Sequence, residues 1–326
     1  MKKVVKIIIC VLLTLIVIAA VGISVFTGDQ VVRNSTKLTQ ADEDFVIPYN
    51  VFTSYHMDYE AFASRYRDER LSLTSSQKDA HEIPADYLFT EGSEDKNHDT
   101  VIMVHGLGGN RMSIYPVAQV FLKNGWNVLA YDQRSSGENH AEGNTFGYLE
   151  KFDLLDWAKQ IREWAPDKRL GIWGTSFGGL TSVLAVCDSS LGLTQQTAFM
   201  VLDCPLSNME DELRLVMNSE DMGGIPTDYL IWTGNIMNKL ELGFTYSEAD
   251  GRAVIRDRMK QSVPLLIFTS GKDELAPYPM GADMFELYPG ENKTLINFED
   301  SEHVDGWKDH EAEYREAVEK LLASIE

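Results

Sequence analysis

Six short apolar runs, separated by segments with helical patterning, constrain the fold of this chain more than any other feature. The runs are Thr100–His105, Asn127–Asp132, Arg169–Thr175, Ala198–Cys204, Val263–Ser270 and Lys293–Glu299. Strands that are apolar on both faces and alternate with helices are typical of a parallel sheet with helices on both faces. Two alternating runs near 70–76 and 83–90 predict an antiparallel strand pair at one edge. The sequence therefore predicts an α/β fold with a mostly parallel central sheet.

A long interval interrupts this alternation. Fifty-eight residues, 205–262, separate the fourth run from the fifth, many more than a simple crossover requires. We expect residues 205–262 to form a helical lid insertion. Within it, four apolar residues recur at spacings of three and four: Tyr229, Trp232, Ile236 and Leu240. This stripe either lines a pocket from above or packs on the body of the domain.

The N-terminal stretch Ile7–Phe26 contains twenty residues and no charge. At about 1.5 Å of rise per residue, a helix of this length spans about 30 Å, the thickness of a bilayer core. Lys2, Lys3 and Lys6 precede it, which predicts a single-pass protein of the cell membrane with a cytoplasmic N-terminus and an extracellular catalytic domain. The alternative is a signal peptide and a secreted product, although the apolar region of a signal peptide typically has only about 7–15 residues.

The chain divides on this basis into an anchor over 1–28, a polar linker or stalk over 29–54 and one large domain over 55–326. The formal charge is −21, from 29 Lys and Arg against 50 Asp and Glu. This charge repels phosphate backbones, so nucleic acid is not an expected partner. The three cysteines form no CxxC pair and no Cys/His cluster, so no structural metal site is expected.

A GxSxG motif, Gly174-Thr175-Ser176-Phe177-Gly178, stands where a strand-like run meets a helical one. A strand that turns abruptly into a helix holds the serine in a strained conformation, and the glycines leave room for the turn. The serine hydroxyl then lies at a helix N-terminus, where the dipole favours developing negative charge. Ser176 is the candidate nucleophile.

A serine nucleophile needs a base, and the candidates follow the last two apolar runs. Asp273 comes just after the fifth run and His303 just after the sixth. The chain order Ser176, Asp273, His303 is the order that this elbow architecture requires. We expect His303 to act as general base and then acid, and Asp273 to orient its ring. Glu274 neighbours Asp273 but fits the motif position less well.

The loop after the first run reads Val104-His105-Gly106-Leu107-Gly108-Gly109. An oxyanion needs a pair of hydrogen-bond donors, and we expect the backbone N–H groups of Leu107 and Phe177 to supply them. His105 ends a strand on the oxyanion side, so we interpret it as a residue that orients the loop rather than as a base.

Together these motifs resemble the α/β-hydrolase superfamily. Within it they resemble the single-span serine hydrolases of the bacterial cell envelope, which are esterase/lipase-like or serine-aminopeptidase-like. The resemblance covers about residues 70–326 and rests on HGLGGNR at 105–111, YDQRSSGEN at 131–139, FGYLEKFDL at 146–154, GTSFGG at 174–179, GKDELAP at 271–277 and SEH at 301–303. Ser135 departs from the glycine of many relatives. The resemblance implies an α/β-hydrolase fold and hydrolysis of an ester, thioester or amide through an acyl-enzyme, with no metal or organic cofactor.

The leading functional hypothesis is a membrane-anchored carboxylesterase that acts on a small acyl ester or an acylated component of the cell envelope. The alternative is an exopeptidase of the serine-aminopeptidase type, in which acidic residues of the insertion bind a free amino terminus. These residues are Glu210, Asp211, Glu212, Glu220 and Asp221. A non-catalytic binding module on the same frame is disfavoured, because all three triad positions are occupied by competent residues.

Overall fold

A single eight-stranded sheet forms the centre of the computed structural model, which describes residues 2–36 and 48–325. Its order is β1-β2-β4-β3-β5-β6-β7-β8. The strands are β1 (Asp68–Thr74), β2 (Glu82–Leu88), β3 (Thr100–Val104), β4 (Asn127–Tyr131), β5 (Leu170–Thr175), β6 (Phe199–Asp203), β7 (Leu265–Ser270) and β8 (Lys293–Phe298). Strands β3 to β8 run parallel, and β1 and β2 pair antiparallel at one edge. The predicted α/β architecture is confirmed.

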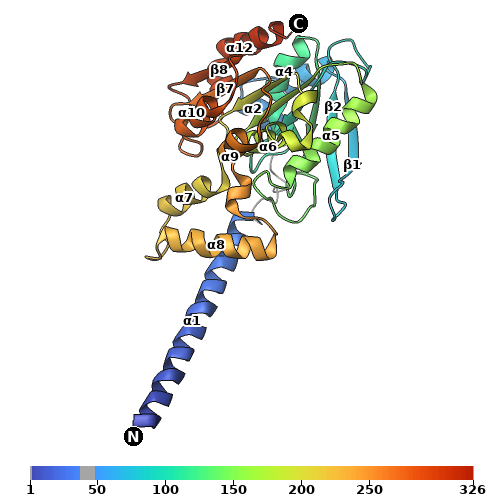
Figure 1. Ribbon diagram of the computed structural model, residues 1–326. Helices are drawn as coiled ribbons and strands as arrows, with labels where there is room; N and C mark the ends of the chain where they lie inside the picture. Colours follow the sequence, from blue (N-terminus) through green and yellow to red (C-terminus); the bar gives the residue numbers. More distant parts are fainter. Residues whose placement is uncertain (1, 37–47, 326) are drawn as a thin grey trace.

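Helices cover both faces of the sheet (Figure 1). One face carries α5 (Glu150–Trp164), α6 (Phe177–Val186), α9 (Gly251–Arg258) and α10 (Tyr278–Leu287). The other carries α2 (Pro48–Ser54), α3 (Tyr59–Arg65), α4 (Tyr115–Lys123), α11 (Gly306–Asp309) and α12 (Glu311–Ala323). Successive strand residues such as Val101 and Ile102 point to opposite faces and are buried in separate clusters. Both faces are therefore buried, which explains why the central strands are apolar throughout.

The interval between β6 and β7 contains α7 (Met209–Ser219), α8 (Thr227–Glu241) and α9. Helices α7 and α8 project from the body, whereas α9 returns to it and packs on α6 and α10 (Figure 1). Short 3-10 turns complete the described chain at Arg111–Ile114, Ser189–Leu191, Thr194–Gln196 and Tyr246–Ala249. The projecting part of the expected lid is thus a pair of helices, α7 and α8.

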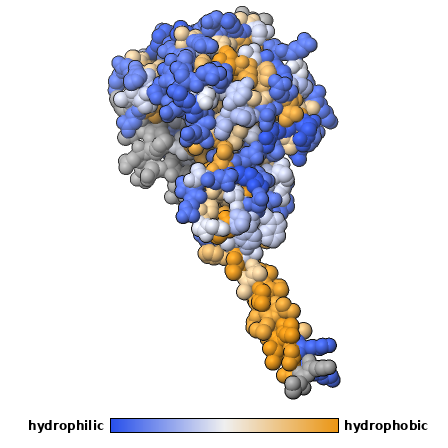
Figure 2. All heavy atoms as spheres, turned by 90° about the vertical axis from the view of Figure 1, so that its left-hand side faces the viewer, coloured by the Kyte–Doolittle hydropathy of each residue, from blue (hydrophilic) through white to orange (hydrophobic). Residues whose placement is uncertain are grey.

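The N-terminal helix α1 (Lys2–Thr36) is long and apolar enough to cross a membrane. Figure 2 shows it as an apolar rod that leaves a mainly polar body. Its last turns correct the predicted linker, because residues 29–36 are helical and pack against α8, with Val32 fully buried. Gly28 allows the close approach, since a Cβ there would lie 2.5 Å from both Met237 Cγ and Thr233 O.

The rest of the predicted linker differs from expectation at its C-terminal end. Residues 48–54 form α2, whose Phe52 is buried in the core under α4. Residues 37–47 lie outside the described part of the chain. Only this middle stretch of the linker therefore stays a prediction.

The apolar stripe of α8 neither lines a pocket from above nor packs on the body. Trp232, Ile236 and Leu240 are 57%, 42% and 73% exposed. The opposite side of α8, with Leu230 and Ile231, is the side that packs inward. The helix is apolar on two sides, and spacing alone did not distinguish the buried side from the exposed one.

Arg111 fastens the loop after β3 to two neighbouring strands. Its guanidinium, 1% exposed, donates from Nε to Asp86 Oδ2 of β2 at 2.8 Å and from Nη1 to Asp132 Oδ2 beyond β4. Its backbone N–H also donates to Asp132 Oδ1 at 2.8 Å. The two buried carboxylates thus hold the loop that contains Leu107 in a fixed position.

Replacing Arg111 with alanine should lower the free energy of unfolding by about 3–5 kcal/mol, because two buried carboxylates lose their shared cation. Urea denaturation of the detergent-solubilised chain at neutral pH measures this loss. The matched control is Arg256→Ala, which breaks an exposed ion pair with Asp257 and should cost less than about 1 kcal/mol. Equal losses in the two variants would contradict the structural role of Arg111.

Candidate active site

Ser176 occupies the turn between β5 and α6 with φ of +52°, in the region that non-glycine residues rarely adopt. The turn brings α6 against the backbone of β3, where a Cβ on Gly178 would lie 2.2 Å from Val104 O. Glycine is therefore the one residue that fits at this position. The motif has the strand–turn–helix geometry predicted for it.

The structure brings together the three residues that the sequence analysis selected. His303 Nε2 lies 2.9 Å from Ser176 Oγ, and His303 Nδ1 lies 2.6 Å from Asp273 Oδ2. Asp273 Oδ1 accepts the backbone N–H groups of Leu275 and Ala276 at 2.9 and 2.7 Å. These bonds fix the carboxylate while its second oxygen faces the imidazole. Glu274 is exposed beside it.

The loop that contains the expected oxyanion donor lies directly beside the serine. Gly106 and Leu107 line the same cleft as Ser176 and His303, with a volume of about 190 Å³. Phe177 is the first residue of α6. Leu107 thus lines the cleft of Ser176, and Phe177 directly follows the serine in the chain; the role of their N–H groups as oxyanion donors stays a prediction.

His105 is fully buried and holds loops together, as its position in the sequence suggested. Its Nδ1 lies 2.7 Å from Gly106 O, and its Nε2 accepts the backbone N–H of Gln133 at 3.0 Å. Burial lowers the pKa of this imidazole, so the neutral ring is favoured. Ser135, in the same loop as Gln133, has φ of +57°, a backbone conformation that glycine adopts more readily than serine.

Asp203 is a buried carboxylate of the site that the sequence analysis did not select. Its carbonyl accepts the N–H of Ser176 at 2.8 Å, and its Oδ2 accepts the hydroxyl of Tyr314 at 3.0 Å. Tyr314 in turn accepts Trp173 Nε1–H at 2.9 Å. Burial raises the pKa of Asp203 to about 7. The one sequence signal was its place at the end of an apolar run.

Cys204 lies next to the same groups. Its Sγ and the ligand atoms of Asp273 and His303 lie within 4.8 Å of one another. Burial raises the pKa of the thiol well above its ordinary range, which keeps it protonated. A protonated thiol is a poor metal ligand, and the other two groups already bond to each other, so these residues fit a triad better than a metal site.

The acidic residues of the insertion do not form one cluster. Glu210 pairs with Arg214 at 2.8 Å and Asp211 with Arg252 at 2.7 Å, whereas Glu220 and Asp221 are exposed. Glu212 differs from them, because its Oε2 is buried and has no hydrogen-bond partner among the described residues.

Burial raises the pKa of Glu212 to about 7, and the neighbouring His303 charge opposes that rise. Sequence alone did not separate this residue from the other four acidic positions.

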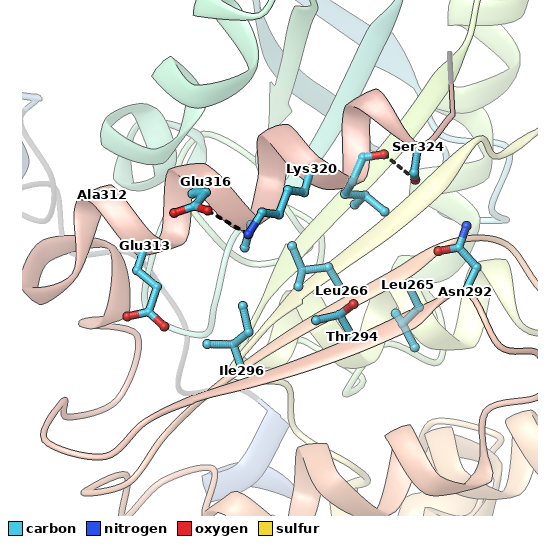
Figure 3. Close-up of a pocket in the computed structure, with 12 residues that line it drawn as sticks. Leu265, Leu266, Asn292, Thr294, Ile296, Ala312, Glu313, Glu316, Lys320 and Ser324 are labelled. Carbon is cyan, nitrogen blue, oxygen red and sulfur yellow. Dashed lines mark hydrogen bonds and ion pairs between the residues drawn. The ribbon is translucent and has the colours of Figure 1, made fainter.

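Among the cavities outside the serine cleft, two are larger than the others described. A pocket of about 550 Å³ extends between α1, α7 and α8 and shares Leu107 with the cleft. A groove of about 760 Å³ runs between α12 and the strands β7 and β8 (Figure 3). Its rim carries the Glu316–Lys320 ion pair, and its floor includes Leu266 and Ile296. It contains none of the triad residues, so the chemistry belongs to the cleft.

Comparisons with known proteins agree with this geometry. Residues 99–222 match a family model described as the alpha/beta hydrolase fold. This match and the solved structures below agree with the observed architecture, and the chain has the α/β-hydrolase fold.

Particular relatives span most of its length. The chain is 27% identical over 259 residues to the uncharacterised protein YqkD of Bacillus subtilis, covering 78% of this chain and 82% of that one. The esterase Pf2001 of Pyrococcus furiosus has a TM-score of 0.61 at 20% identity, over 81% of this chain and 94% of its own. XC6422 of Xanthomonas campestris, described as an α/β serine hydrolase without a lid, has a TM-score of 0.52 at 17% identity, over 78% and 94%.

The raised pKa of Glu212 predicts a stability effect that depends on pH. The folded state holds the proton more tightly than the unfolded state, so the wild type loses stability as pH rises from about 4.5 through about 7. Glu212→Gln should therefore stabilise the protein at pH 8, by up to about 3 kcal/mol at 1.36 kcal/mol per pKa unit. Below about pH 4 the two proteins should be equally stable.

Chemical denaturation of the solubilised chain at both pH values tests this expectation. The matched control is Glu210→Gln on the same helix, which loses an exposed ion pair instead and should not become more stable at high pH. A Glu212→Gln effect that is the same at pH 4 and pH 8 would show that Glu212 titrates normally.

Proposed function

We propose that this protein is a hydrolase of the serine carboxylesterase type, with Ser176 as nucleophile, His303 as general base and acid, and Asp273 as the residue that orients His303. The observation that carries the proposal is the hydrogen-bonded chain at the elbow, 2.9 Å from serine to histidine and 2.6 Å from histidine to aspartate. Both distances lie within the range for a nucleophile and its base.

The geometry supports a two-step reaction. Ser176 Oγ attacks the ester carbonyl carbon as His303 Nε2 takes its proton, and Asp273 stabilises the resulting imidazolium through Nδ1–H. The backbone N–H groups of Leu107 and Phe177 stabilise the oxyanion. His303 then protonates the departing alcohol. Water, deprotonated by the same nitrogen, attacks the acyl carbon. The bond from this carbon to Ser176 Oγ then breaks as His303 returns the proton to Oγ, which releases the carboxylic acid and the free serine.

An ester substrate is supported over an amino-terminal peptide by the surroundings of the cleft. The pocket that adjoins it through Leu107 has mainly apolar walls, which suit an acyl chain. The observation that favours the exopeptidase alternative is Glu212, whose Oε2 is buried and has no hydrogen-bond partner among the described residues. Its raised pKa means that much of it is uncharged near neutral pH, and a neutral carboxyl binds an ammonium group weakly. We therefore keep the exopeptidase as the second candidate.

We further propose that α1 stays attached as a membrane anchor, with the catalytic domain on the outer side. Its last turns support this, because they join the body directly: Val32 is fully buried and Thr36 O accepts the N–H of Asn144 at 2.8 Å. If the anchor is retained, mass spectrometry of the protein from the membrane fraction should give the mass of the full chain, including its N-terminal residues. A product that lacks the first twenty or so residues would favour the secreted alternative.

Ser176→Ala should abolish labelling by a fluorophosphonate probe and lower kcat for p-nitrophenyl acetate by at least about 10⁴-fold, since the nucleophile is lost. Asp273→Asn should cost about 10³- to 10⁴-fold, because the imidazole loses its orienting carboxylate. The matched control is Glu274→Gln, the exposed neighbour, which should retain nearly full activity. Labelling that persists in Ser176→Ala would reject the assigned nucleophile.

The two candidate functions differ in their response to Glu212→Gln. For a carboxylesterase, turnover of p-nitrophenyl butyrate should exceed that of aminoacyl-nitroanilides, and the substitution should change it by only a few fold. For an exopeptidase, aminoacyl-nitroanilides should be the better substrates, and the same substitution should raise their KM by at least about tenfold because the ammonium group loses its counter-charge. Steady-state kinetics on both substrate series decides between them.

A further inference from the structure

An apolar pocket lies between the C-terminal part of α1 and Leu107, a residue that also lines the serine cleft. Ten apolar side chains line most of its wall: Phe26, Val31, Leu107, Phe146, Leu213, Val216, Met217, Met222, Ile225 and Leu230. Its volume of about 550 Å³ falls within the range of about 300–1,000 Å³ that small ligands occupy. No helix or strand of the described chain fills this space.

Two residues of the pocket lining belong to very different surroundings. Phe26 is the last residue of the uncharged stretch that could span a bilayer. Leu107 also lines the cleft of Ser176 and His303. A chain-like ligand that binds along this pocket would thus reach from the level where the span ends to the reacting serine.

The crossing of α1 and α8 fixes where a bilayer surface would lie. Ser24 Oγ is 2.9 Å from the hydroxyl of Tyr229, so the Tyr229 side of α8 faces the span. Trp232, Ile236 and Leu240 follow Tyr229 at helical spacing on this side and are exposed. Figure 1 shows α8 lying across α1 at the base of the body. An exposed face with tryptophan and aliphatic side chains at this level is typical of a helix that rests in a membrane interface.

We propose that the substrate is an ester lipid of the outer leaflet. Its acyl chain passes beside Phe26 into the pocket, while its ester carbonyl reaches Ser176 past Leu107. This proposal rests on the proposed carboxylesterase function. Hydrolysis consumes one water and releases a fatty acid and the alcohol part of the lipid. Because the acyl chain moves from one apolar environment to another, its methylene groups are not transferred through water, which would be unfavourable.

The first experiment narrows the pocket and measures chain-length preference. The full chain is reconstituted in vesicles of ether-linked phosphatidylcholine, which contain no carboxylic ester bonds. Val216 is 45% exposed and lines the pocket, so Val216→Trp fills it without disturbing the core. We expect the ratio of kcat/KM for p-nitrophenyl laurate to that for p-nitrophenyl acetate to fall at least tenfold.

The matched control is Leu215→Trp, the adjacent exposed residue of α7 outside the pocket, which should leave the ratio unchanged. An unchanged ratio in Val216→Trp, with acetate still hydrolysed, would overturn the proposal and leave the esterase function intact. If the wild type neither hydrolysed p-nitrophenyl acetate nor reacted with the fluorophosphonate probe, the proposed function itself would be rejected.

The second experiment tests the route of entry. Dilauroylglycerol is placed either in the same ether-lipid vesicles as the protein or in separate ones, and released laurate is measured. We expect hydrolysis in the same vesicle to be at least tenfold faster. Equal rates would mean that the lipid enters through water, which contradicts entry from the bilayer.

Discussion

The left-handed backbone of Ser176 is the constraint on which the rest of the site depends. A non-glycine residue in this conformation costs about 1–3 kcal/mol, and the end of β6 supplies the bonds that hold it. Ser176 N–H donates to Asp203 O at 2.8 Å, and Ser176 O accepts the N–H of Leu206 at 3.1 Å. These bonds point Oγ away from the sheet toward His303. The end of β6 thus stabilises the strained backbone of Ser176, and it lies at the same carboxyl end of the sheet from which Asp273 and His303 follow.

Much of this arrangement could be predicted from sequence because its signals are local. Each triad residue follows directly after an apolar run, and the carboxyl ends of parallel strands meet at one edge. The partners of Asp203 could not be predicted in this way. Tyr314 belongs to the last helix, 111 positions further along the chain, and no local pattern pairs a core tyrosine with a carboxylate. The same holds for Arg111, whose motif was recognised but whose partner Asp86 comes from an antiparallel strand.

The N-terminal region shows how local composition can mislead. Asp29, Gln30 and Arg33 make the segment after the apolar stretch look like a polar linker. In the fold, Asp29 and Arg33 pair along the exposed side of α1 at 2.8 Å, while Val32 is buried. Tertiary packing therefore decides that the helix continues. The close packing of α1 on α8 requires small residues such as Gly28. Such residues leave no periodic pattern in the sequence.

This continuity determines which substrates the serine can reach. A flexible stalk of 26 residues would let the catalytic domain move over a wide range of heights and orientations. The observed helix instead runs without a break from the apolar stretch into the body, where α1 packs on α8. If α1 spans the bilayer as proposed, the serine stays at a fixed position relative to its surface. Under that proposal, the α1–α8 contact that forms one wall of the apolar pocket would also confine the protein to substrates at that surface.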